Sequence, residues 1–153
     1  MPGAQSVNED TSLSIGGISV NDVDGNLATT QLSVTNGALN VSLAGGATIS
    51  AGANGNSTLT LSGTQAQINA ALASISYQGN ADFNGAEALT VLSTDTNGVT
   101  DSVALSITVS SVNDGPVNTV PGAQTVNEDT SLSIAGISVN DVDGNLATTQ
   151  LRR

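Results

Sequence analysis

The sequence LTVLSTDTNGVTDSVALSITV at residues 89–109 predicts a long antiparallel hairpin. Leu89 and Val91 alternate with polar residues before the turn, and an apolar residue occupies every second position from Val103 to Val109 after it. Alternation with a period of two is typical of a strand that buries one face, and the Asp95–Gly98 segment between the two runs consists of turn-forming residues. This stretch therefore indicates an antiparallel β fold.

Further strand and turn signals lie on the N-terminal side of this hairpin. Apolar residues alternate from Ser12 to Val20, with a change of phase at Gly16-Gly17 that predicts a bulge or a bend between two half-strands. Asn36-Gly37 predicts a second hairpin, because this dipeptide favours tight turns and alternating apolar residues flank it. Thr58–Leu61 predicts another strand.

One segment has a different period. Thr64-Gln65-Ala66-Gln67 fits a capping box, and Ile68, Ala71, Leu72 and Ile75 recur at helical spacing, so we expect a short helix over residues 64–74 that crosses between two sheets. Together with about seven strands, these signals predict an all-β, Greek-key sandwich of the cadherin and immunoglobulin type with one short helix. A β-helix would need a much shorter internal repeat.

The chain also contains an internal duplication. The stretch Asn21-Asp22-Val23-Asp24-Gly25-Asn26 returns at residues 140–145, within a block in which residues 2–32 match residues 121–151 except at Ser6/Thr125 and Gly16/Ala135. The offset predicts one complete repeat at residues 1–118, followed at residues 119–153 by a linker and the truncated start of the next repeat.

The charge balance excludes several functions. The sequence has 13 acidic and two basic residues, a net charge of −11, and no His, Cys or Lys. This composition argues against binding to nucleic acid or to anionic lipid, and no apolar run predicts direct insertion into a membrane. Without His, Cys or Lys, only paired carboxylates are available for acid–base chemistry, so we do not expect an enzyme.

The oxygen-bearing side chains concentrate in the predicted turns and strand ends. Carboxylate and amide oxygens without nitrogen or sulfur ligands favour Ca²⁺ over transition metals. The alternative is that these residues are ordinary solvated turns, and we expect Glu87 and Asp101 to lie on solvated strand faces. The candidate metal ligands are Glu9, Asp10, Asp22, Asp24, Asn26, Asp82, Asn84, Asp95, Asn113, Asp114, Asp141, Asp143 and Asn145.

The order of these motifs resembles that of the cadherin-like tandem repeats of large bacterial surface adhesins. The resemblance covers the whole repeat, from Asn8-Glu9-Asp10 to the closing group of Asn113, Asp114 and Pro116. It implies an extracellular, calcium-binding extender at the cell surface, with a secretion signal outside this sequence, that serves adhesion or biofilm formation. It also implies that Ca²⁺ binds between neighbouring repeats, with Glu9, Asp82, Asn84, Asn113 and Asp114 facing Asp141, Asp143 and Asn145 of the following repeat, and with Asp22, Asp24, Asn26 and Asp95 facing a preceding one.

Two other functions remain open. The partial second copy predicts self-association, because strand-forming sequence without the rest of its domain leaves open edges. The chain would then form homo-oligomers or a head-to-tail filament, in addition to contacts with neighbouring repeats of the same polypeptide. A calcium-dependent glycan-binding domain is the second alternative.

Overall fold

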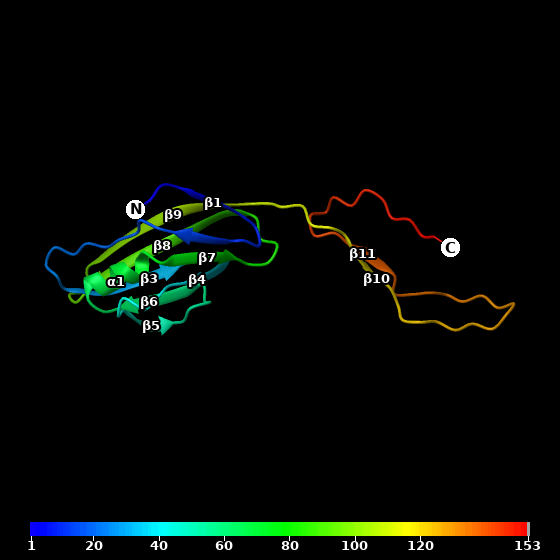
Figure 1. Cartoon of the computed structure of the whole chain (residues 1–153), viewed down its shortest axis with the longest axis horizontal. Helices are drawn as coiled ribbons and strands as arrows, with labels where there is room; N and C mark the ends of the chain where they lie inside the picture. The colour runs from blue at the N-terminus through cyan, green and yellow to red at the C-terminus, as the bar shows by residue number, and fades with distance from the viewer. Residues whose placement is uncertain (153) are drawn as a thin grey trace. The chain divides into compact units, whose positions relative to one another are not determined.

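The computed structural model describes residues 1–152 in two compact units, residues 1–111 and residues 112 onward. The first unit is a β-sandwich of two sheets with one short helix (Figure 1). This arrangement confirms the predicted all-β sandwich. No helix of residues 1–152 has the length and apolar character needed to cross a membrane.

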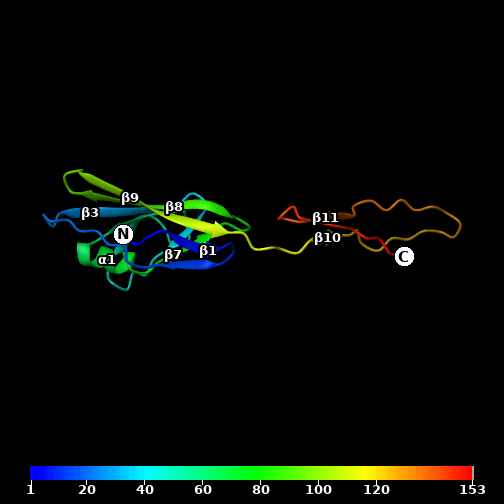
Figure 2. The ribbon, with the colours of Figure 1, turned by 90° about the horizontal axis from the view of Figure 1, so that it is seen from above.

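The larger sheet has six strands. Its order is β1-β9-β8-β3-β6-β5, and every neighbouring pair is antiparallel except β1 and β9, which are parallel. Figure 2 labels β1, β9, β8 and β3 of this sheet. The predicted long hairpin is part of this sheet: β8 and β9 pair from Gly85↔Val109 to Thr94↔Thr100. The strands are β1 (Gln5–Asn8), β3 (Leu27–Ser33), β5 (Thr48–Gly52), β6 (Thr58–Ser62), β8 (Gly85–Asp95) and β9 (Thr100–Ser110).

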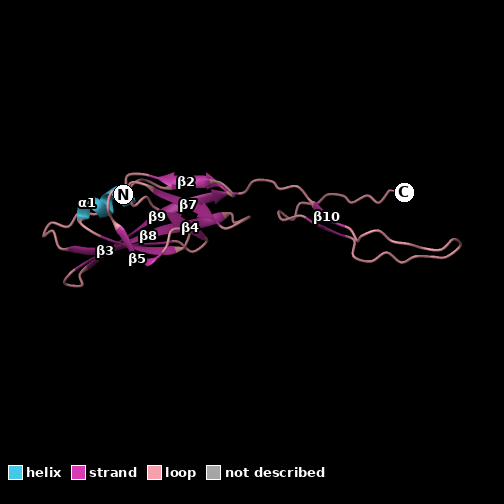
Figure 3. Cartoon of the chain, turned by 60° about the horizontal axis from the view of Figure 1, so that its bottom comes forward, coloured by secondary structure: helices cyan, strands magenta, loops and turns pink. Residues whose placement is uncertain are grey.

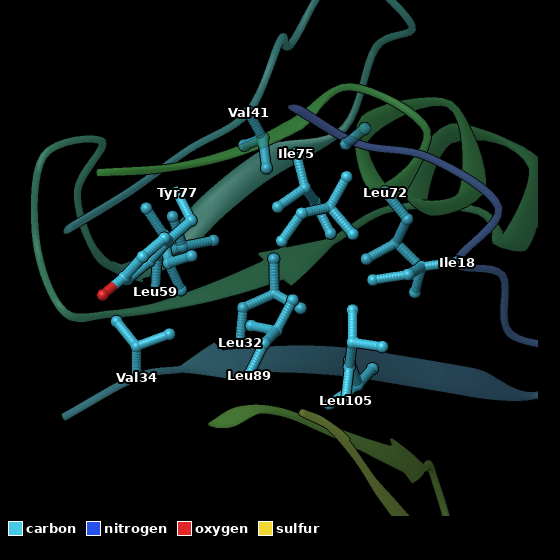
Figure 4. Close-up of a cluster of buried hydrophobic side chains, with 14 of the residues drawn as sticks. Ile18, Leu32, Val34, Val41, Leu59, Leu72, Ile75, Tyr77, Leu89 and Leu105 are labelled. Carbon is cyan, nitrogen blue, oxygen red and sulfur yellow. The ribbon is translucent and has the colours of Figure 1, made fainter. Parts of the chain in front are cut away.

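The smaller sheet has three strands in the order β2-β7-β4, with both neighbouring pairs antiparallel. They are β2 (Ser12–Ile15), β4 (Gly37–Asn40) and β7 (Ile75–Gly79). The core lies between the two sheets: Leu32, Leu89 and Leu105 point from the larger sheet toward Ile75 and Tyr77 (Figure 4). Nearly all of this core is aliphatic, and Tyr77 is its one fully buried aromatic residue.

The helix α1 (Gln65–Leu72) joins β6 of the larger sheet to β7 of the smaller one, as predicted (Figure 3). Thr64 caps it by accepting from the backbone N–H of Gln67, and the Gln67 side chain accepts from the backbone N–H of Thr64 at 2.8 Å. Ile68, Ala71 and Leu72 are buried. The local sequence signal was sufficient here because both cap partners lie within four residues.

The predicted hairpin at Asn36-Gly37 is wrong. The strands on its two sides, β3 and β4, belong to different sheets, so this segment crosses the sandwich. Gly37 is required for close packing: a Cβ at this position would overlap the carbonyl oxygen of Gln78 and the ring of Tyr77. The predicted second half-strand at Ile18–Val20 is also absent from the described structure, although Ile18 is buried and Gly17 has φ +78°.

Glu87 is buried, so the prediction that it lies on a solvated face is wrong. Its Oε1 accepts from the backbone N–H groups of Thr35 at 3.2 Å and Ala88 at 2.7 Å, and its Oε2 accepts from that of Asn36. The carboxylate thereby fixes the segment that crosses between β3 and β4. A buried charge needs such donors, because burial without them is strongly unfavourable.

The second unit contains one short antiparallel ladder between β10 (Val117–Thr119) and β11 (Ser138–Asn140). Residues 120–137 connect these two strands and contain no helix or strand. The predicted boundary between residues 118 and 119 stays a prediction.

Candidate functional site

The predicted ligands fall into three groups along the chain. Two groups lie in the first unit, at opposite ends of β9. The third lies in the second unit. The carboxylates of each group have different hydrogen-bond partners.

The first group surrounds a pocket that we call the loop pocket. It lies between the 19–27 segment and the turn that joins β8 to β9, and four carboxylates and two amides line it: Asp22, Asp24, Asp95, Asp101, Asn21 and Asn26. Its other walls include the apolar side chains of Leu27, Val91, Val99 and Val103. The structure therefore brings together four of the predicted ligands within a single unit.

Hydrogen bonds to the backbone hold two of these carboxylates in place. Asp22 Oδ1 accepts from the N–H groups of Asp24 at 3.0 Å and Gly25 at 3.1 Å. Asp95 Oδ1 accepts from the N–H groups of Asn97 at 2.9 Å and Val99 at 2.8 Å. Both arrangements are local turns in which an Asp side chain replaces a backbone acceptor. One oxygen of each carboxylate is thus occupied in shaping its loop.

Asn26 connects the two loops. Its backbone carbonyl accepts from the N–H of Thr96 at 3.0 Å. With its side-chain nitrogen toward Asp22, the amide donates to Asp22 Oδ2 at 2.9 Å, while its oxygen accepts from Asn97 Nδ2 at 2.9 Å. Rotation of the Asn26 amide group by 180° places its oxygen beside the Asp22 carboxylate, and a bound cation favours this arrangement of two oxygens.

Asp101 was not predicted as part of this site. It pairs with Ser93 across the β8–β9 ladder and shares the residue parity of Val103 and Leu105. Alternate residues of a strand lie on the same face, so Asp101 belongs to the inward face of β9, at the open end of the sandwich. This alternation is the sequence signal that could have identified Asp101 as a residue of the pocket.

The second group lies where β1 ends. Asn84 Nδ2 donates to Glu9 Oε2 at 3.1 Å, and the N–H of Asp82 donates to Asp10 Oδ1 at 3.2 Å. Glu9 is buried and is held next to β9 by its own N–H, which donates to the Ser110 carbonyl at 2.9 Å. Asp10 and Asp82 both have positive φ, 59° and 57°, which places them in tight turns. The structure therefore brings together Glu9, Asp10, Asp82 and Asn84.

The third group lies within the second unit. The N–H of Asp114 donates to Asp143 Oδ2 at 2.6 Å, and Asn145 Nδ2 donates to Asn113 Oδ1 at 2.7 Å. The Oδ1 atom of Asp141 is buried without a hydrogen-bond partner among the described residues. These contacts join four of the five predicted ligands of this unit in two pairs, Asp114 with Asp143 and Asn113 with Asn145. The predicted metal site that combines both units stays a prediction.

No cationic side chain is available to neutralise these groups within residues 1–151, since the only basic residues are Arg152 and Arg153. Carboxylates that line one pocket repel one another, and a bound cation relieves that repulsion. The four carboxylates and two amides of the loop pocket offer the oxygen donors that a hard cation binds.

Comparison with known proteins gives one family. The model of the Protein GAMETE EXPRESSED 2 domain matches residues 10–104, which is more than half of the 153-residue chain. No curated protein and no solved structure matches the chain. The matched range contains every residue that lines the loop pocket except Met1, and most of the sandwich.

This match overturns the resemblance to cadherin-like repeats of bacterial adhesins. The predicted function as a calcium-binding extender of a bacterial adhesin, for adhesion or biofilm formation, is wrong for the same reason. The physical cause is that Asp, Asn and Gly occur in the turns of many β-sandwiches, where they shape loops as Asp22 and Asp95 do here. Their order along the chain follows the order of the turns and does not identify a family.

Proposed function

The chain belongs to the family of the Protein GAMETE EXPRESSED 2 domain, and from this premise we propose that it is a non-catalytic β-sandwich module that binds a divalent cation, Ca²⁺, in the loop pocket. The family's name refers to expression in gametes and to no ligand, so the proposed ligand follows from the side chains that line the pocket. The observation that carries the proposal is that Asp22, Asp24, Asn26, Asp95 and Asp101 all line one pocket in a unit without basic side chains.

Calcium suits this pocket better than magnesium does. Ca²⁺ accepts six to eight oxygen ligands in flexible geometry, whereas Mg²⁺ requires near-ideal octahedral geometry and retains several waters. The pocket lies between two loops, and its geometry is therefore more adaptable than a site on rigid strands, which favours Ca²⁺. Bound Ca²⁺ would fix the 19–27 segment to the β8–β9 turn and so stiffen this end of the sandwich.

The site chemistry also supports proposals about location and partners. Calcium sites of extracellular modules have dissociation constants of about 10⁻⁴–10⁻³ M, and loop sites of this kind function where free Ca²⁺ is abundant. We therefore place the module outside the cell, with neighbouring repeats of the same polypeptide as its first partners. Without His, Cys or Lys, its acids serve binding and not catalysis.

Thermal unfolding of the whole chain tests the proposal. We expect about 10 mM Ca²⁺ to raise the melting temperature of the sandwich and an equal concentration of Mg²⁺ to raise it much less; a ligand at 100 times its Kd stabilises by about 2.7 kcal/mol. The double variant Asp22→Asn with Asp95→Asn keeps the side-chain acceptors that shape both loops but removes two charges. It should lose most of the calcium-dependent rise.

A matched control removes two charges elsewhere. Glu128→Gln with Asp129→Asn changes exposed residues of the second unit that are not candidate ligands. It should retain the full response to Ca²⁺. An equal response in both double variants, or no response in the original chain, would refute the loop pocket as the calcium site.

A further inference from the structure

The second copy of the duplicated block carries the sequence of two strands that it does not form. Residues 124–137 repeat residues 5–18 with two differences, Thr125 for Ser6 and Ala135 for Gly16. In the first unit this sequence forms β1 and β2. In the second unit the corresponding residues contain no strand.

The apolar side chains of the two copies have opposite exposure. Ile15 and Ile18 are 1% and 2% exposed in the sandwich, whereas their counterparts Ile134 and Ile137 are 54% and 49% exposed. The counterparts of Val7 and Leu13, which pack against the core, are also exposed. Such a row of exposed apolar side chains gains free energy from burial, and the sandwich contains sites of matching shape.

The local backbone of the second copy already matches the first. Asp129 has φ 61° and Asp10 has φ 59°, and in both turns a Thr hydroxyl donates to an Asn carbonyl at 2.6 Å, from Thr130 or from Thr11. Gly136 has φ +81°, close to the +78° of Gly17. The turn between the two strand-forming segments of the second copy therefore has the same conformation as the turn between β1 and β2, although these segments form no strands.

The positions of β1 and β2 allow exchange without disruption of the rest of the sandwich. Each is an edge strand with a single neighbour, β9 for β1 and β7 for β2. By contrast β3, the next strand of the block, lies between β8 and β6, and its replacement would open the larger sheet. An exchange therefore ends before residue 146, the counterpart of Leu27 at the start of β3.

We propose that residues 124–137 of one molecule replace residues 5–18 in the sandwich of a second copy of this chain. Thr125 then lies beside Thr108 of β9, as Ser6 does within one molecule, and Ile134 and Ile137 take the buried positions of Ile15 and Ile18. This is strand addition to an edge combined with domain exchange.

The two sequence differences both favour the exchanged strand. Thr has a higher preference for β structure than Ser. At Gly16 a Cβ would meet no atom within 4 Å, and the backbone there is not in the left-handed region, so Ala135 fits and restricts the unfolded chain more than Gly does.

Mixed cysteine variants test the exchange directly, because the chain has no Cys of its own. The Thr108→Cys protein is mixed at high concentration with the Thr125→Cys protein in chelator, warmed to partial unfolding, cooled and oxidised. We expect a disulfide-linked heterodimer by mass spectrometry, since neighbouring strands place Cα atoms within disulfide range. The control partner is Asn118→Cys, an exposed residue of β10 outside the segment, and it should give only background linkage.

A second pair of variants tests the burial of the segment. Ile134→Asp places a charge where Ile15 is buried and should abolish both the heterodimer and the concentration-dependent rise in mass by light scattering. Ser133→Asp changes the counterpart of the exposed Ser14 and should leave both intact. The proposal would be overturned if the yield of heterodimer equalled the Asn118→Cys background, or if Ile134→Asp did not lower that yield. It would also be overturned if a Thr108→Cys, Thr125→Cys double variant formed only intramolecular disulfides. The use of chelator makes the result independent of the calcium site.

Discussion

Tyr77 is the residue in which the packing of this sandwich can be measured most directly. Its side chain is fully buried, and its hydroxyl donates to the carbonyl of Asn36 at 2.7 Å. Burial, with a further contribution from the nearby Glu87 carboxylate, raises the pKa of Tyr77 from 10.0 to about 12. Both effects disfavour the phenolate.

This shift predicts a loss of stability in alkali. The pKa is higher in the folded than in the unfolded state, so the folded state keeps the proton where the unfolded state has lost it. The contribution is complete below about pH 10 and is lost as the pH rises through about 12. The free energy of unfolding from urea titrations should therefore fall across this range, by about 2–3 kcal/mol for a shift of this size.

Absorbance provides the site-specific readout, because Tyr77 is the only tyrosine. The phenolate band of the folded chain should develop about two pH units later than that of the chain in urea. Tyr77→Phe should lower stability at neutral pH, since the hydrogen bond to Asn36 is lost, and should flatten the alkaline decline. A decline of equal size in the Tyr77→Phe variant would assign the effect to other groups.

Residue parity shows which site features the sequence contained. Glu87 has the parity of Leu89 and Val91, so it belongs to the inward side of the hairpin, although its charge suggested a solvated face. Asp101 has the parity of Val103 and Leu105 but is exposed, in agreement with the solvated position predicted for it. Parity alone could not show that Glu87 would meet the N–H groups of Thr35 and Asn36, which are about fifty positions away.

At the scale of elements, the sequence predicted the features that depend on neighbouring residues and did not predict the strand pairing that depends on residues far apart in the chain. The α1 helix and the β8–β9 hairpin were predictable because the cap partners and the turn residues lie within a few positions of each other. Asn36-Gly37 has the same local character as a hairpin turn, yet its flanking strands pair with different partners. The choice between one sheet and two depends on side chains of β7 that the local sequence does not contain.

The segment between β3 and β4 gives a direct test of this interpretation. Gly37→Ala adds a Cβ against the Gln78 carbonyl and the Tyr77 ring, so we expect the free energy of unfolding to fall by about 1–3 kcal/mol, as in other overpacked cores. A tight turn alone, exposed to solvent, would not create this overlap. Urea unfolding followed by circular dichroism measures the change.

Gly3→Ala is the matched control, because a Cβ at Gly3 meets nothing within 4 Å. It should leave stability within about 0.5 kcal/mol or raise it slightly. If Gly37→Ala proves as neutral as Gly3→Ala, then close packing against β7 does not explain the glycine.

At the scale of the whole molecule, the alternation of apolar residues was sufficient to predict the sandwich. It was not sufficient to predict that β1 runs parallel to β9, because such pairing depends on contacts between the two ends of the first unit. The turn motifs also did not predict the family, as the match to residues 10–104 shows. Motifs made of turn formers describe loops, and loops of this kind are shared among unrelated sandwiches.

The charge of the first unit leads to a last prediction. Residues 1–111 contain eight carboxylates, at positions 9, 10, 22, 24, 82, 87, 95 and 101, and no Lys, Arg or His. Their mutual repulsion is greater in the compact fold than in the unfolded chain, so it lowers stability at low ionic strength. Raising NaCl from about 0.01 M to about 0.5 M shortens the screening length from about 30 Å to a few ångströms.

The melting temperature in chelator should therefore rise with NaCl by several degrees. For a unit of this size, such a rise corresponds to an increase of about 1 kcal/mol in the free energy of unfolding. The double variant Asp24→Asn with Asp101→Asn removes two charges whose side chains have no hydrogen-bond or ion-pair partner in the described part of the chain. It should melt higher than the original chain at low salt and respond less steeply to NaCl. A response as steep as that of the original chain would show that repulsion around the loop pocket does not limit stability, because salt would then act through the protein surface as a whole.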